Sequence, residues 1–127
     1  MTGRRGLVLD AGAFIALENR DEMMTRFVER VRHDGIPLVT SAGVVARVWR
    51  GGKGKQVHIS FLLRRTTVID LDSSVAKALG LVLGISGCTD PVNAHVVFLA
   101  RERGWPVLTS DPGALQAIDP RVEIEVI

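Results

Sequence analysis

The chain has 127 residues, of which 46% are hydrophobic and 24% charged; this composition excludes a disordered or fibrous protein and fits one globular domain over residues 1–127. A formal net charge of +2 permits a nucleic-acid partner without requiring one. Cys88 is the lone cysteine, which excludes an intrachain disulfide and a zinc site built from cysteine pairs. Because the sequence has neither a secretory signal nor an apolar run of membrane-spanning length, we expect a cytoplasmic protein without membrane contact.

Short apolar runs, which are typical of buried strands, recur along the sequence. They cover residues 7–10, 36–40, 66–71 and 106–109. A last segment, residues 122–127, alternates apolar with acidic residues and predicts an edge strand with one face in water.

Helices are predicted between these strands, because apolar residues there recur at helical spacing. Residue types that commonly cap helix N-termini mark the starts: Asp10, Asp21, Thr40 or Ser41, Asp72 and Asp90. A helix over residues 56–65 is expected to turn three apolar side chains to the core: Val57, Phe61 and Leu62. A loop is expected at residues 84–89. Strands that alternate with helices predict an α/β fold, with three α/β/α layers around a mainly parallel sheet.

Three aspartates lie where this pattern ends a strand or opens a helix: Asp10, Asp90 and Asp111. The carboxyl ends of neighbouring parallel strands meet at one edge of the sheet, where such folds bind ligands. Carboxylates gathered there would hold Mg²⁺ or Mn²⁺, whose bound water can attack a phosphodiester. Aspartate is also a common helix cap, and the position of Asp10 fits both interpretations equally.

Four segments occur together in the order found in a known family: VLDAGAFIALE, a serine-led helix ending in VWRGG, TDPVNAHVVFLA and VLTSDPGAL. In this order and spacing they resemble the PIN domains, and among them the VapC-type toxin ribonucleases of bacterial toxin–antitoxin pairs. The resemblance runs from Gly6 to Asp119 and implies a PIN-like fold. It further implies an endoribonuclease that cuts RNA with Mg²⁺ or Mn²⁺ and is inhibited by an antitoxin. The family and the apolar helices together suggest a homodimer or a hetero-complex.

The resemblance also assigns residues to the site. The family's first acid falls on Asp10 and its strand-four acid on Asp111. Asp90 would join them as a third catalytic and metal-binding carboxylate. The hydroxyls of Thr109 and Ser110 lie beside Asp111 in the sequence and would position the reactants.

Two positions depart from the family pattern. The acid of the buried helix falls on Asn93, one helical turn after Asp90, where an amide oxygen can still bind a metal or position a ligand but brings no charge. The family's glutamate on the third helix falls near Ala46-Arg47. A guanidinium at that point would oppose metal entry, or would bind an RNA phosphate through its fork of donors.

A basic run lies next to this position and has two interpretations. Its members are Arg47, Arg50, Lys53 and Lys55. As a track along RNA phosphates, the run would bind RNA with little sequence preference and strong salt dependence. As an ordinary helix end, its cations would favour the C-terminus of the helix.

The remaining candidates are better explained by packing. His95 lies inside an apolar helix, where a core histidine is more common than a catalyst. Trp49 and Trp105 are expected to pack rather than to stack on RNA bases, because aromatic residues are few and scattered. Neither Ser110 nor Cys88 has a base at motif spacing, which argues against nucleophilic catalysis.

Two hypotheses about function therefore remain. The first is a metal-dependent, PIN-like ribonuclease of the toxin–antitoxin type with reduced activity. The second is a catalytically degenerate PIN-like domain that binds RNA or an antitoxin. A nucleotide-binding α/β protein is disfavoured, because no glycine-rich phosphate loop follows a strand.

Overall fold

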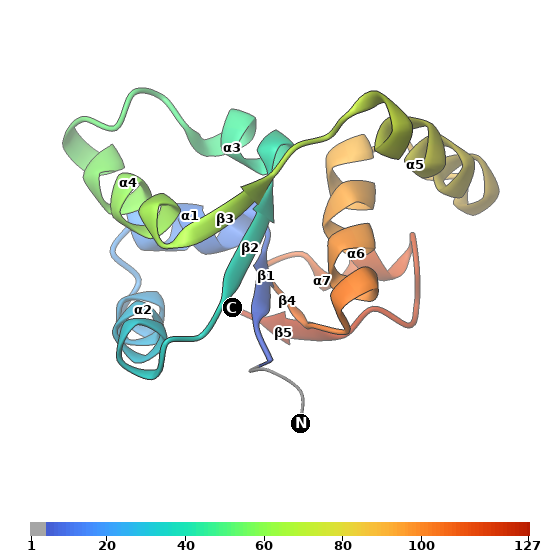
Figure 1. Cartoon of the computed structure of the whole chain (residues 1–127). Helices are drawn as coiled ribbons and strands as arrows, with labels where there is room; N and C mark the ends of the chain where they lie inside the picture. Colours follow the sequence, from blue (N-terminus) through green and yellow to red (C-terminus); the bar gives the residue numbers. More distant parts are fainter. Residues whose placement is uncertain (1–4) are drawn as a thin grey trace.

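A five-stranded sheet lies at the centre of the structure, a computed structural model that describes residues 5–127 except for the side chain of Lys55 (Figure 1). The strands are β1 (Leu7–Leu9), β2 (Leu38–Ser41), β3 (Thr66–Ile69), β4 (Val107–Thr109) and β5 (Ile124–Val126). Their order in the sheet is β3-β2-β1-β4-β5, and every neighbouring pair is parallel. The expected parallel sheet is therefore confirmed.

Helices cover both faces of this sheet. They are α1 (Ala11–Glu18), α2 (Glu22–Asp34), α3 (Ala42–Val48), α4 (Val57–Arg64), α5 (Ser73–Ser86), α6 (Pro91–Arg103) and α7 (Pro112–Gln116), with a 3₁₀ turn at Gly54–Gln56. In Figure 1, α1, α2 and α4 lie on one side of the sheet and α5, α6 and α7 on the other. The α/β fold with three layers is confirmed.

Burial is greatest in the three central strands and in α6. All the residues of β1, β2 and β4 are buried. The buried residues of α6 are Ala94, His95, Val96, Val97, Leu99 and Ala100. The edge strands β3 and β5 are partly exposed. β5 is an edge strand as expected for residues 122–127, but it is limited to Ile124–Val126, and Val126 is exposed together with the acidic face. The middle of the sheet and α6 thus form the centre of the hydrophobic core, which buried residues of α1, α2, α3 and α4 complete.

Side chains of aspartate and serine begin most of the helices, as the sequence predicts. Each of six side chains accepts a hydrogen bond from a backbone N–H of the helix that follows it: Asp10, Asp21, Ser41, Asp72, Asp90 and Asp111. These bonds satisfy donors that would otherwise be unpaired in the first turn. The capping role predicted as the alternative for Asp10 is therefore present.

Two predictions about helices are wrong. The predicted loop at 84–89 begins too early, because α5 continues to Ser86 and ends at Gly87, whose φ of 76° suits a glycine C-cap. Val57 does not face the core: its exposed fraction is 56%, and the buried residues of α4 are Ile59 and Leu62. The 3₁₀ turn before α4 has three residues per turn, so it shifts the phase of the helix relative to the sequence pattern.

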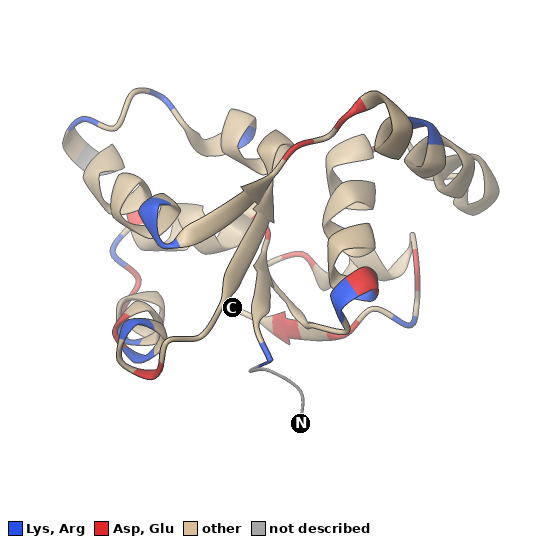
Figure 2. Ribbon diagram, viewed as in Figure 1, with Lys and Arg blue, Asp and Glu red and all other residues tan. Residues whose placement is uncertain are grey.

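Most of the surface of α5 is exposed. The helix packs on α6 and buries Leu79, whereas Leu81 and Ile85 are 73% and 89% exposed. Lys77 is its lone charged residue (Figure 2), and three of its large apolar side chains are exposed: Leu81, Val82 and Ile85. Among residues 5–127, no single helix is long and apolar enough to cross a membrane; α5 and α6 meet the criterion only together, across a bend of 103°.

Two glycines let the helices approach one another at the carboxyl edge of the sheet. A Cβ atom added at Gly12 of α1 would lie 2.3 Å from the Ser110 hydroxyl and 3.0 Å from the Ser110 backbone nitrogen. A Cβ atom at Gly43 of α3 would lie 2.7 Å from a methyl group of Val92 in α6. The absence of these side chains therefore brings α1 against the end of β4, and α3 against α6.

We expect Gly12→Ala to lower the free energy of unfolding by about 1–3 kcal/mol, because the new methyl group would push the segment after β4 away from α1. Gly113→Ala is the matched control, since a Cβ atom there meets nothing within 4 Å. Urea denaturation of the two variants and the wild type measures the difference. Equal stability of all three proteins would contradict the close approach.

Candidate active site at the carboxyl edge of the sheet

The order of the strands defines where a ligand would bind. From β1 the chain runs outward through β2 to β3, and then returns to place β4 on the other side of β1. The switch point of the sheet therefore lies between the carboxyl ends of β1 and β4, where open α/β sheets bind ligands. Asp10 directly follows β1, and Thr109 is the last residue of β4.

Asp10 is held from both sides at this switch point. Its Oδ1 accepts a hydrogen bond of 2.8 Å from the Ala11 N–H, and its Oδ2 accepts one of 2.8 Å from the Thr109 hydroxyl. The side chain is nearly buried, with an exposed fraction of 7% for the residue. Asp10 is thus both the N-cap of α1 and a carboxylate at the switch point.

The Thr109 hydroxyl links the backbone of Asp111 to the carboxylate of Asp10. The Thr109 hydroxyl oxygen accepts a hydrogen bond of 3.0 Å from the Asp111 N–H while donating to Asp10. The side chain of Asp111 turns toward its own helix, where its Oδ1 accepts a weak bond of 3.3 Å from the Ala114 N–H. Asp10 and the backbone of Asp111 therefore share one hydroxyl, and the carboxylate of Asp111 caps α7.

Asp90 has a different partner, the guanidinium of Arg47. Arg47 lies in the last turn of α3, and its Nη2 forms an ion pair with Asp90 Oδ2. Its Nη1 donates a hydrogen bond of 3.3 Å to Asn93 Oδ1. The second oxygen of Asp90 accepts from the N–H groups of Val92 and Asn93, at 2.9 and 3.1 Å. Arg47 therefore joins α3 to the first turn of α6.

These contacts explain the ionisation of Asp90. Burial opposes the charged carboxylate, but hydrogen bonds from Arg47 and Asn93 and the charge of Arg47 outweigh burial and lower the pKa of Asp90 below its usual value. The ion pair therefore contributes to stability above the ordinary aspartate pKa, and the contribution is lost as the pH falls through the lowered value.

The described side chains do not fit a divalent cation held by the three aspartates. Among residues 5–127, no group of three or more His, Cys, Asp or Glu side chains could hold a metal ion. Asp90 is neutralised by Arg47, and Asn93 brings an oxygen without charge. Mg²⁺ and Mn²⁺ are hard cations that depend on carboxylate charge for binding. The expected metal site is therefore not assembled from Asp10, Asp90 and Asp111.

The predicted phosphate track is only partly available. Arg47 is bound to Asp90 and Asn93. The guanidinium of Arg50 turns back onto the end of α3 and donates to the carbonyl oxygens of Ala46 and Trp49, at 3.1 and 2.7 Å. Lys53 is exposed, and the side chain of Lys55 lies outside the described residues. The contacts of Arg50 favour the helix-end interpretation of this run.

His95 and Ser41 form a buried pair that the sequence did not predict as such. The two residues are fully buried, with Ser41 Oγ 2.6 Å from His95 Nδ1. Ser41 Oγ also accepts from the Gly43 N–H, and His95 Nε2 has no hydrogen-bond partner in the described part of the chain. The packing role expected of His95 agrees with these contacts. The sequence does show a serine at the end of a predicted strand and a histidine inside an apolar helix. Nothing in it indicates that the two side chains meet, because 54 residues separate them.

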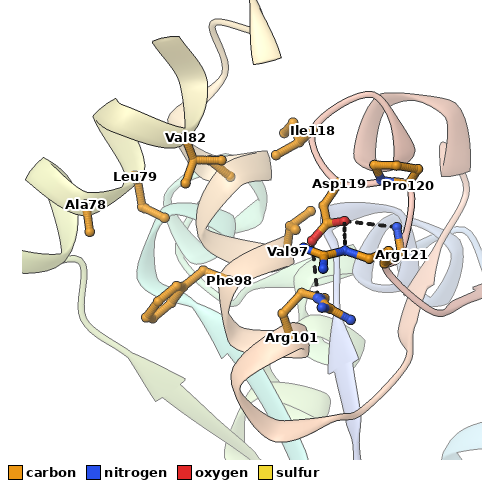
Figure 3. A pocket seen from close by; sticks show the side chains of 11 residues that line it. Ala78, Leu79, Val82, Val97, Phe98, Arg101, Ile118, Asp119, Pro120 and Arg121 are labelled. Atoms are coloured by element: carbon orange, nitrogen blue, oxygen red, sulfur yellow. Dashed lines mark hydrogen bonds and ion pairs between the residues drawn. The ribbon is translucent and has the colours of Figure 1, made fainter. Parts of the chain in front are cut away.

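A separate hollow of about 430 Å³ lies between α5, α6 and the segment after α7 (Figure 3). Its walls are mostly apolar and include Ala78, Leu79, Val82, Val97, Phe98 and Ile118. At one end Asp119 pairs with Arg101 and Arg121. None of the predicted site residues lines this hollow, so it is separate from the candidate site at the carboxyl edge of the sheet.

We expect the stability of the protein to fall as the pH drops below about 6.5, partly because of His95. Burial first, and then the charge of Arg103, lowers the pKa of His95 in the folded protein, so the unfolded chain takes up the proton first. His95→Gln should flatten the dependence of the free energy of unfolding on pH between about 5 and 7. Urea denaturation across this range measures the slope, and the same slope in both proteins would contradict the assignment.

Comparison with known proteins gives a clear result for the fold. No family model matches the sequence, and no curated protein matches it significantly. Solved structures do match. The chain is similar to one in DNA-bound VapBC from Salmonella typhimurium, at 20% identity and a TM-score of 0.70, over 97% of this chain and 98% of that chain.

Two further structures agree over nearly the full length. A chain of VapBC2 from Rickettsia felis, bound to a promoter DNA fragment, has 14% identity and a TM-score of 0.69, over 95% of this chain and 98% of that chain. A chain of FitAB bound to the IR36 DNA fragment has 19% identity and a TM-score of 0.61, over 94% of each chain. At these identities the similarity establishes the fold. The chain thus has the fold of the VapC-like PIN domains, as the four sequence segments predicted.

Proposed function

We propose that this chain is the toxin-type member of a toxin–antitoxin pair and that it binds an antitoxin protein. The observation that carries the proposal is the fold: it matches, over nearly the whole chain, proteins solved as VapBC and FitAB. The order of the four sequence segments supports the same family.

The geometry supports a binding protein with a degenerate site better than a working nuclease. Asp90 is paired with Arg47, and the amide of Asn93 replaces the carboxylate that the family resemblance implies. Binding of RNA along the basic run has weaker support, because Arg47 and Arg50 are engaged with the protein itself. We therefore assign the antitoxin, rather than RNA, as the first partner.

A metal-dependent endoribonuclease is the second candidate, and one observation favours it. The Asp10 carboxylate and the backbone N–H of Asp111 share the Thr109 hydroxyl at the switch point of the sheet, where the family's acids are expected. In this candidate, Mg²⁺ or Mn²⁺ would supply the charge that stabilises the phosphodiester during cleavage. Asp10 and Asp111 would be the catalytic pair, and Thr109 and Ser110 would position the RNA.

Binding of an antitoxin is tested by expressing the chain together with the protein of the adjacent reading frame. We expect the two proteins to copurify as a complex of fixed stoichiometry, measured by light scattering after gel filtration. Separate elution of two folded proteins would contradict the proposal.

Cleavage of RNA distinguishes the two candidates. We expect the wild type to cut a panel of labelled single-stranded and hairpin RNAs no faster than Asp10→Asn does, with Mg²⁺ or with Mn²⁺. Asparagine keeps the size of the side chain and one oxygen to accept the bond at the start of α1. Cleavage that depends on the metal and falls about 100-fold or more in Asp10→Asn would make the ribonuclease the function.

Self-association is expected through α5. Its exposed apolar surface includes Leu81, Val82 and Ile85, and exposed apolar patches often mark protein interfaces. We expect the wild type to sediment as a dimer and Leu81→Glu/Ile85→Glu to sediment as a monomer. Met23→Glu, at a residue 68% exposed on α2, is the control and should remain dimeric. A monomeric wild type, or a dimeric double variant, would contradict this arrangement.

A further inference from the structure

The guanidinium of Arg47 lies at the place where the family resemblance implies metal-binding oxygens. It contacts Asp90 Oδ2 through one nitrogen and Asn93 Oδ1 through another. Asp90 is the N-cap of α6 and Asn93 lies in its first turn, whereas Arg47 comes from the last turn of α3. One cationic group thus bridges two oxygens across two helices.

The other oxygen of Asp90 is also occupied. Asp90 Oδ1 accepts the N–H groups of Val92 and Asn93, which fixes the carboxylate at the start of α6. Asp10 is fixed in a similar way by Ala11 and Thr109. The carboxylates at this edge are therefore held by donors of the protein itself.

A guanidinium neutralises carboxylate oxygens permanently, whereas a divalent cation has to bind to them from solution. Arginine stays protonated at every ordinary pH and presents donors in a rigid plane. Because Arg47 is part of the chain, its charge is always present at high effective concentration and cannot be removed by dilution or by a chelator. A metal ion would have to displace it and then remain next to its positive charge.

We propose that Arg47 takes the place of a divalent cation at this edge, so that the wild-type chain binds neither Mg²⁺ nor Mn²⁺ there. Its guanidinium neutralises Asp90 and ties α3 to α6, the two tasks that a bridging metal would perform. The inference concerns metal binding, which is measured on the chain without a partner, so its failure is distinguishable from a failure to bind the antitoxin.

The test is a titration of the purified full chain with Mn²⁺, followed by the electron paramagnetic resonance signal of the free ion. The wild type is expected to bind no Mn²⁺ at this edge. Arg47→Glu/Asn93→Asp replaces a cation and a neutral amide with two carboxylates. Its affinity for Mn²⁺ should be at least about tenfold higher than any residual affinity of the wild type. Mn²⁺ should then raise the melting temperature of the double variant and leave that of the wild type unchanged.

Two further variants keep the proposal falsifiable if the double variant does not fold. Arg47→Gln removes the charge with little change of size, and it too should gain affinity for Mn²⁺; adding Asp90→Asn should remove this gain. Arg101→Gln is the matched control, because it also deletes an arginine paired with an aspartate, at the far end of α6. It should leave Mn²⁺ binding as in the wild type.

Mn²⁺ binding by the wild type that Asp10→Asn or Asp90→Asn abolishes would overturn the proposal. Folded Arg47→Gln and Arg47→Glu/Asn93→Asp proteins that bind Mn²⁺ no better than the wild type would also overturn it. Formation of the antitoxin complex by the wild type is measured separately and is unaffected by either result.

Discussion

The ion pair between Arg47 and Asp90 decides what the carboxyl edge of this sheet can do. Parallel strands bring Asp10 and the segment around Asp111 to one edge, and the starts of α1, α6 and α7 gather there as well. Positive ends of helices and backbone N–H groups already stabilise the carboxylates. Arg47 adds a full positive charge to this edge. In the account proposed above, this charge leaves less for a divalent ion to neutralise at Asp90, while Asp10 and Asp111 accept only hydrogen bonds from the described residues.

The helices are held in this arrangement by small residues and buried polar contacts. Gly12 allows α1 to lie against Ser110, and Gly43 allows α3 to lie against Val92 of α6. The hydrogen bond between Ser41 and His95 joins the end of β2 to the middle of α6. Because α3 and α6 are fixed by these contacts, the backbone already holds Arg47 close to Asp90, and only the freedom of the side chains is lost when the pair forms. The scaffold therefore favours the ion pair before the side chains meet.

Local signals predicted much of this structure. Asp90 marked the start of α6, and apolar runs marked the strands, because caps and burial depend on neighbouring residues. The four segments together predicted the fold and the unusual arginine. The sequence did not predict which partner Arg47 has, because that contact joins two elements far apart in the sequence, α3 and α6. Nor did it predict that α5 leaves Leu81 and Ile85 exposed, since apolar spacing alone does not distinguish a core from an interface.

The most direct test of the account is anomalous diffraction at the manganese absorption edge, from crystals of the wild-type protein soaked in a manganese salt. The account predicts the guanidinium of Arg47 between Asp90 and Asn93, with no manganese peak at the carboxyl edge of the sheet. A manganese ion coordinated by Asp10 and Asp111, with Arg47 turned away from Asp90, would contradict it.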